Sequence, residues 1–265
     1  MMSDPIAEKM QQGVDQGVFP GAVLLVSHKG RAVHHSAYGS ACVLPNREPA
    51  TVDTIYDLAS LTKPIATATA AAFLAADGRL GLDDPLERYV PELTQDGLRK
   101  ATIRHLLNHT SGLPAWRPFY ERIVPDGRTL REQPLSARRA AIYDAIHREP
   151  LVEPVGGRCV YSDLGFILLG EIVERLAKRE WAAFCHGVVF PWLGVQDLFY
   201  MSESGPPRDI SLTGRRFAAT EQDDWRGRMI RGEVHDENAA VMGGVSAHAG
   251  LFGTAVSVAR AVSPW

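Results

Sequence analysis

The sequence has few cysteines, no excess of positive charge and no long hydrophobic run. Its 265 residues include three scattered cysteines and no Cys-x-x-Cys pair, which argues against a disulfide framework and favours a reducing compartment. The net charge of -3 lacks the basic field that nucleic-acid binding requires. No signal-peptide pattern opens the chain, and no apolar run could span a bilayer. These absences predict a cytoplasmic protein that binds neither nucleic acid nor membrane.

One short stretch, residues 58–64, combines a serine and a lysine at the predicted start of a buried helix. Ser60 is a good N-cap residue, and the almost entirely apolar run over residues 65–76 is typical of a helix buried on all sides. Lys63 lies three residues after Ser60, so the two side chains share a helix face. A serine, an amine that can take its proton and the free N–H groups of a helix tip are the components of an acyl-transfer site.

Ser-x-x-Lys by itself is a weak motif, because a capping serine followed by a solvated lysine is ordinary. Two facts favour catalysis here. Ser60 is the only serine of the sequence with a lysine three residues later. A lysine at the start of an otherwise apolar helix also requires a reason to be there, because lysine is rarely buried without a partner.

Around this stretch the sequence predicts a strand hairpin, a helical middle and a return. Residues 21–28 and 31–39 are rich in β-forming residues and flank the two-residue turn Lys29-Gly30. The apolar spacing predicts further helices at 4–17, 103–109, 136–147, 164–178 and 255–262, a short strand at 54–57, and no clear period over 215–231. We therefore expect an α/β (α+β) fold, with an antiparallel sheet lobe, a helical lobe and Ser60 where the lobes meet.

A second polar group, Tyr161-Ser162-Asp163, directly precedes a predicted helix. A tyrosine beside a lysine can share its proton, and a phenolate held by an ammonium is a competent general base. Asp163 could position that lysine or bind substrate. Considered alone, these residues favour a structural interpretation, in which Tyr161 is a half-buried loop aromatic and Asp163 is the N-cap of the helix that follows.

Together, three stretches resemble the serine β-lactamase and penicillin-binding-protein family: Ser60-x-x-Lys63, residues 105–113 and residues 161–171. The most similar branch is that of the class C β-lactamases and their related serine esterases. The resemblance implies that Ser60 is the acylated nucleophile, Lys63 its proton partner and Tyr161 a second base. Asp163 stands where the family usually has asparagine, which weakens any expectation of amide-side-chain recognition.

The resemblance also implies a closing strand near the C-terminus, with a Lys-Thr-Gly or His-x-Gly motif that supplies one N–H of the oxyanion hole. His248-Ala249-Gly250 matches this motif, so His248 and Gly250 are candidate substrate-binding residues. The same residues also resemble an earlier glycine-rich segment of the family, residues 243–255, which precedes a helix of the helical lobe. We favour this second interpretation, which predicts that the closing strands and part of the central sheet are absent from the 265 residues.

We therefore expect one β-lactamase-like domain, with the hairpin and nucleophile helix in residues 1–80 and a mainly helical lobe in residues 81–265. The expected reaction is cleavage of a small-molecule ester or amide through an acyl-enzyme on Ser60, with an esterase favoured over a β-lactamase. Residues 235–238 contain possible metal ligands, but the sequence has no second His/Glu cluster with zinc spacing. It also has no phosphate-binding loop. We therefore expect neither metal nor cofactor. The alternative is a fragment that binds acyl compounds or a partner without turnover.

Overall fold

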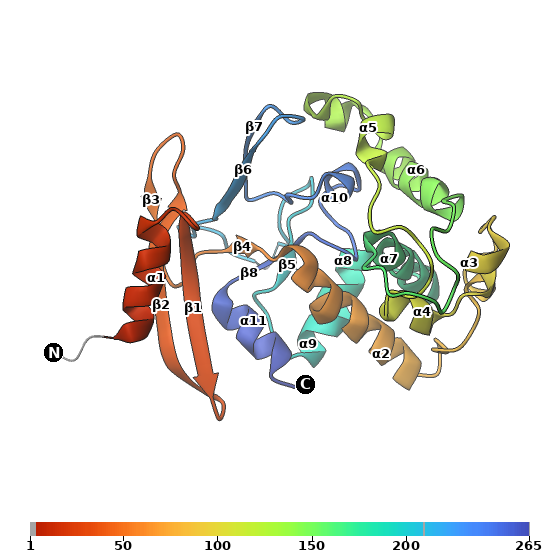
Figure 1. Cartoon of the computed structure of the whole chain (residues 1–265), viewed down its shortest axis with the longest axis horizontal. Coiled ribbons are helices and arrows are strands. Elements are labelled where there is room, and N and C mark those ends of the chain that lie inside the picture. The colour runs from red at the N-terminus through yellow and green to blue at the C-terminus, as the bar shows by residue number, and fades with distance from the viewer. Residues whose placement is uncertain (1–3, 209, 265) are drawn as a thin grey trace.

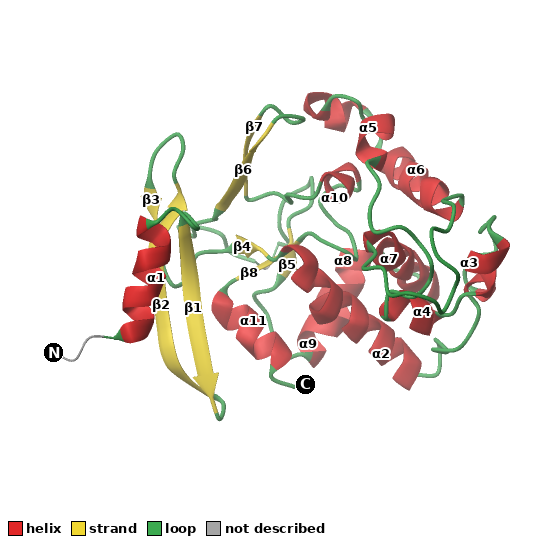
Figure 2. Cartoon of the chain, in the orientation of Figure 1, coloured by secondary structure: helices red, strands yellow, loops and turns green. Residues whose placement is uncertain are grey.

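The computed structural model describes residues 4–208 and 210–264. A small sheet from the N-terminal part of the chain lies on one side, and most helices lie on the other (Figures 1 and 2). The strands are β1 (Gly21–His28), β2 (Arg31–Cys42), β3 (Glu48–Pro49), β4 (Tyr56–Asp57), β5 (Phe199–Tyr200), β6 (Ala219–Asp223), β7 (Arg228–Arg231) and β8 (Leu251–Gly253). The helices are α1 (Pro5–Asp15), α2 (Thr69–Ala76), α3 (Asp96–Lys100), α4 (Ile103–Leu107), α5 (Phe119–Ile123), α6 (Leu135–His147), α7 (Asp163–Ala177), α8 (Trp181–Phe184), α9 (Phe190–Trp192), α10 (Glu237–Val241) and α11 (Ala255–Val262).

The predicted hairpin is confirmed. Strands β1 and β2 pair antiparallel from Gly21 opposite Gly39 to the turn. Lys29 and Gly30 both have positive φ, 50° and 75°, which is the backbone conformation that a two-residue hairpin turn demands. Among the described residues, the sheet order is β1-β2-β3, so β1 pairs on one edge only.

Helix α11 runs beside β1 and departs from the sequence prediction in its position. The helix itself is where the sequence placed it, and Thr254 caps it in a capping box. However, α11 packs against β1 and contributes Ala261 to the main core, so it lies between the two lobes (Figure 1). An apolar groove of about 610 Å³ between β1 and α11 is lined by residues such as Val23, Leu25 and Val258.

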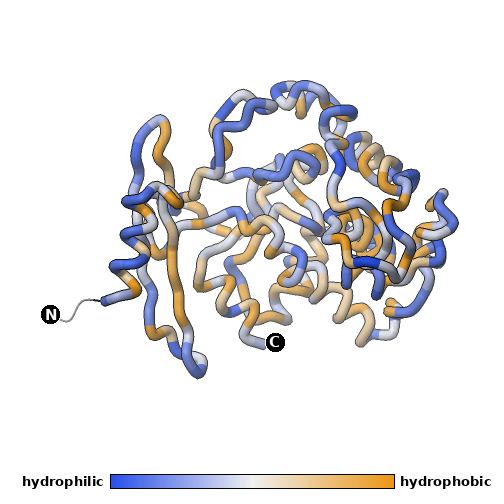
Figure 3. The backbone as a smooth tube through the Cα atoms, in the orientation of Figure 1, coloured by the Kyte–Doolittle hydropathy of each residue, from blue (hydrophilic) through white to orange (hydrophobic). Residues whose placement is uncertain are grey.

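The main core surrounds α7, whose residues from Leu164 to Val173 are buried without interruption. Figure 3 shows apolar residues gathered around this helix and α2, with hydrophilic residues along the β6–β7 hairpin. Gly170 permits a close approach, because a Cβ there would meet the Cβ of Ala247 at 2.5 Å. Helix α7 therefore packs directly against the glycine-rich segment that precedes β8.

Two pieces of β structure were not predicted. Residues 215–231 contain the antiparallel β6–β7 hairpin, whose strands bury only Asp223 and Ile230. With so little burial, no apolar alternation marks these strands in the sequence. Strand β8, three residues long, pairs with both β4 and β5, so a second small sheet draws on residues 199–253 that were expected to be mainly helical.

No helix in the described part of the chain combines the length and the apolar character that crossing a membrane requires.

Candidate active site

Ser60 and Lys63 lie in an irregular start to the predicted helix. Residues Ala59–Leu61 form a single 3-10 turn, Lys63–Ala68 are π-helical, and regular α-helix begins only with α2. Such π-helical turns are frequent at functional sites. Ser60 makes no capping hydrogen bond, so the prediction that it is an N-cap is wrong. Its hydroxyl instead accepts from Lys63, with Nζ to Oγ at 2.8 Å, which confirms that the two share a face.

Lys63 is buried, with 2% of its surface exposed, whereas Ser60 is exposed. The lysine Nζ donates hydrogen bonds to Ser60 Oγ at 2.8 Å and to the carbonyl oxygen of His248 at 3.2 Å, and it forms an ion pair with Asp163 Oδ1 at 2.6 Å. Two hydrogen bonds and one ion pair therefore hold the buried amine, and one of its hydrogen-bond partners is the accessible serine.

Asp163 is available to Lys63 because its neighbour caps α7. The hydroxyl of Ser162 accepts from the Gly165 N–H at 3.2 Å, and Ser162 is the N-cap. The interpretation of Asp163 as the cap is therefore wrong. Its own N–H donates to the Ala115 carbonyl at 2.9 Å, which fixes the residue and leaves the carboxylate to pair with Lys63.

The aromatic ring of Tyr161, rather than its hydroxyl, lies beside Lys63. The side chain is 52% exposed, and its ring centroid lies 4.9 Å from Lys63 Nζ. Over residues 4–208 and 210–264, no hydrogen bond joins the Tyr161 hydroxyl to Ser60 or Lys63. Tyr161 is therefore at the site, but the structure does not connect its hydroxyl to the proton path.

His109 is a site residue to which sequence reasoning assigned no role. Its Nδ1 accepts from the Ser162 N–H at 3.0 Å, and its ring lies 4.5 Å from that of Tyr161. Burial, followed by the charge of Lys63, lowers the pKa of His109 against the opposing effect of Asp163, so the neutral ring supports the turn. In the sequence, the signal that could have identified His109 was its place within the family-like stretch 105–113. The structure places it in a backbone turn with φ of 60°.

His248 and Gly250 lie in the buried segment before β8. The imidazole of His248 is 1% exposed, and both ring nitrogens are hydrogen bonded within the protein, to Ser246 Oγ and to Asp236 Oδ1. The imidazole therefore has no free nitrogen for a substrate, and a role of His248 in substrate binding stays a prediction. Gly250 is buried with φ of 101°, and a Cβ there would lie 2.6 Å from the Gly244 carbonyl oxygen. Its part in the site is to turn the chain into β8.

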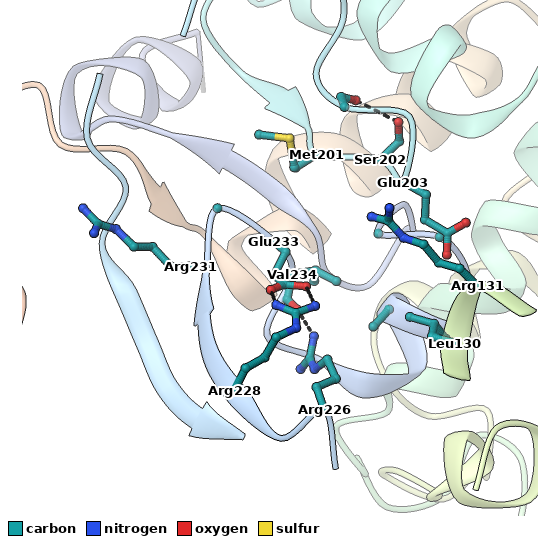
Figure 4. A pocket seen from close by; sticks show the side chains of 15 residues that line it. Leu130, Arg131, Met201, Ser202, Glu203, Arg226, Arg228, Arg231, Glu233 and Val234 are labelled. Atoms are coloured by element: carbon teal, nitrogen blue, oxygen red, sulfur yellow. Dashed lines mark hydrogen bonds and ion pairs between the residues drawn. The ribbon is translucent and has the colours of Figure 1, made fainter. Parts of the chain in front are cut away.

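Two other clusters of charged residues lie outside this constellation. A cavity of about 350 Å³ is lined by Arg131, Arg228 and Glu233 among others, and not by Ser60 or Lys63 (Figure 4). Arg228 and Glu233 pair across it. One carboxylate oxygen each of Glu221, Asp223 and Glu237 lies within 4.8 Å of the others. Glu221 already pairs with His235, and Asp223 with Arg226.

Comparisons with known proteins identify the family of this chain. A model of the β-lactamase family matches residues 6–264. The chain belongs to the β-lactamase family. It is thus a relative of the class C β-lactamases and penicillin-binding proteins, which confirms the predicted resemblance and fold class.

Three similar proteins illustrate the range of this β-lactamase family. The N-acetylmuramyl-L-alanine amidase of Bacillus subtilis (strain 168) is 31% identical over 95% of this chain and 60% of its own length. A class C β-lactamase from Rhodobacter sphaeroides superposes with a TM-score of 0.72 and 23% identity over 97% of this chain and 64% of its own. EstCE1, a hydrolase with promiscuous acyltransferase activity, superposes with a TM-score of 0.70 and 24% identity. The match covers 97% of this chain and 70% of EstCE1. The present chain thus spans about 60% of the length of the curated relative.

Proposed function

We propose that this β-lactamase-family chain is a serine hydrolase that cleaves a small-molecule ester or amide through an acyl-enzyme on Ser60. The observation that carries the proposal is the 2.8 Å hydrogen bond between buried Lys63 Nζ and exposed Ser60 Oγ. A nucleophilic hydroxyl within hydrogen-bond reach of a group that can exchange its proton, itself oriented by a third group, is the signature of covalent catalysis. Asp163 is the third group.

The proton path follows from the distances around the lysine. Lys63 first passes a proton to Asp163, whose Oδ1 lies 2.6 Å from Nζ. The neutral amine then takes the hydroxyl proton of Ser60 as Oγ bonds to the carbonyl carbon. When the tetrahedral intermediate collapses, Lys63 returns that proton to the leaving oxygen or nitrogen. Water then bonds to the acyl carbon as it gives a proton to Lys63, which passes that proton to Ser60 Oγ when the second intermediate collapses and the acid leaves. Asp163 finally returns its proton to Lys63.

Tyr161 is the competing base. The family resemblance assigns it that role, whereas the geometry connects Lys63 to Asp163 more directly. Because the Tyr161 ring lies beside the ammonium and is half exposed, we propose that it covers Lys63 from solvent. Shielding of this kind strengthens the electrostatic interactions of the site.

We propose carboxylic esters as the first candidate class of substrate. Asp163 in place of the usual asparagine favours this choice over β-lactams, and a hydrolase with acyltransferase activity shares the fold. Amides are the second candidate, because the 31% identical relative is named as an amidase. Both reactions use the same acyl-enzyme chemistry and differ in the leaving group that Lys63 protonates.

The deciding experiment labels the chain with a fluorophosphonate and maps the adduct by peptide mass spectrometry, beside turnover assays with nitrophenyl acetate, a chromogenic β-lactam and a D-alanyl peptide amide. We expect the adduct on Ser60 and ester turnover that Ser60→Ala abolishes. Ser136→Ala is the matched control, because Ser136 is exposed on α6 away from the site.

Labelling that survives Ser60→Ala would refute the nucleophile. A Ser60 adduct without turnover of any substrate would instead support the alternative, a protein that binds acyl compounds without releasing them.

A further inference from the structure

A buried histidine and a partly buried carboxylate lie beneath the site, and the proton path above does not use them. His248 Nδ1 is 2.8 Å from Ser246 Oγ, and His248 Nε2 is 2.9 Å from Asp236 Oδ1. Ser246 and His248 are each 1% exposed, so this serine is out of reach of a substrate. A fully hydrogen-bonded buried network of this kind fixes one conformation of the chain.

The backbone of this network holds the nucleophile helix. The His248 carbonyl oxygen accepts from Lys63 Nζ, and the adjacent Ala247 carbonyl accepts from Thr67 Oγ1. Lys63 and Thr67 are four residues apart, so two consecutive carbonyls bind one face of the helix. On its other side, Ala247 packs closely against Gly170 of α7. The segment is thus clamped between the two helices that carry Lys63 and Asp163.

Asp236 joins the network to α10 and to the lysine. Its Oδ1 also accepts from the Ala239 N–H at 2.7 Å as the N-cap of α10. Although burial alone raises the pKa of Asp236, the charge and hydrogen bond of His248, the Ala239 N–H and the charge of Lys63 lower it overall. The carboxylate is therefore charged at neutral pH and attracts the Lys63 ammonium.

The residue before Asp236 ties the network to the nucleophile turn. The His235 N–H donates to Asp57 Oδ2 at 2.7 Å, and Asp57 Oδ1 accepts from the Ala59 N–H at 2.8 Å. Ala59 precedes Ser60 and has a left-handed φ of 45°, a conformation that persists only where neighbours hold it. One segment, residues 235–236, therefore connects the serine turn with the support beneath the lysine.

We propose that His248 and Asp236 are positioning residues for Lys63: the hydrogen-bonded pair fixes the peptide carbonyl that holds the lysine Nζ between Ser60 and Asp163. The inference rests on the proposed function. Without the pair, the carbonyl at residue 248 is free to rotate and Lys63 loses one of its two hydrogen-bond acceptors. The ammonium then settles on Asp163 and away from the Ser60 hydroxyl, so acylation slows while substrate binding does not change.

The test compares His248→Gln and Asp236→Asn with a matched control, His147→Gln. His147 and Glu171 form another buried pair, with Nε2 2.8 Å from Oε2, away from the site. Asparagine is a good N-cap, so Asp236→Asn retains α10 and folds. We expect both site variants to lose about tenfold or more in kcat for nitrophenyl acetate, to keep KM within about threefold and to shift the pH–rate profile. We expect His147→Gln to lose thermal stability without changing that profile.

A readout independent of activity is the crystal structure of each site variant. We expect Lys63 Nζ to lie beyond hydrogen-bond distance of the residue 248 carbonyl and of Ser60 Oγ. Folded variants that keep the lysine in place, with the kcat and pH profile of the control, would overturn the inference. If the wild-type chain shows no Ser60 adduct, the proposed function fails, and the lysine position in these structures still decides the positioning role.

Discussion

Replacing Asp163 with asparagine separates its charge from its shape. The carboxylate oxygen lies 2.6 Å from Lys63 Nζ, and the lysine side chain is 3% exposed. Removing one partner of a buried ion pair outright costs about 3–5 kcal/mol. Asparagine retains an acceptor oxygen at the same position and loses only the charge, so we expect Asp163→Asn to cost about 2 kcal/mol, less than the loss of the whole partner.

This loss converts into a measurable shift in melting temperature. With an unfolding entropy of about 2.1 cal/mol/K per residue, a chain of this length shifts by roughly 2 °C for each kcal/mol. Asp163→Asn is therefore expected to lower Tm by roughly 4 °C in calorimetry. Its effect on activity should be much larger, because an amide cannot take a proton from Lys63. Loss of a general base costs a factor of about a hundred or more in rate.

The assay is the rate of Ser60 labelling by a fluorophosphonate, measured from acid to alkaline pH, with Asp163→Glu as the variant that keeps the charge. We expect the glutamate variant to retain part of the rate and the asparagine variant to lose it. Asparagine is the residue that the family usually carries here, so the reasoning has a clear point of failure. If Asp163→Asn labels within a few-fold of wild type at every pH, Asp163 is not the proton acceptor and Tyr161 is.

Lys63→Arg should abolish Ser60 acylation while the protein still folds, because a guanidinium remains charged and cannot take the serine proton; labelling at the wild-type rate would show that Lys63 has only a structural role. Tyr161→Phe should leave the labelling rate within about tenfold of wild type, since it keeps the ring that shields Lys63 and loses a hydroxyl outside the proton path; a larger loss would make Tyr161 the base. Burial and the charge of Asp236 raise the pKa of Glu237 above its ordinary value. A raised pKa disfavours the charged form in the folded state, so Glu237→Gln should raise Tm at about pH 7, and the gain should disappear below about pH 4; a gain that is independent of pH would contradict this explanation.

The sequence alone determined the features that depend on neighbouring residues. The β1–β2 hairpin follows from alternating β-forming residues around Lys29-Gly30, and its turn needs only the local backbone. The hydrogen bond between Lys63 and Ser60 likewise follows from a spacing of three residues at the start of a helix. The order of the three motif stretches also indicated the family, whose model matches residues 6–264.

Only the tertiary structure decided which partners complete the site. Asp163 meets Lys63 across 100 positions of sequence because Ser162 caps α7 and leaves the carboxylate free. Nothing local to either residue encodes that contact. His248 lies 185 positions from Lys63 in the sequence, and its buried backbone carbonyl accepts a hydrogen bond from the lysine Nζ, a contact that no sequence pattern indicated. Long-range contacts of this kind arise from how α7 and the segment before β8 pack on the nucleophile helix, and a linear pattern of residue types does not contain that geometry.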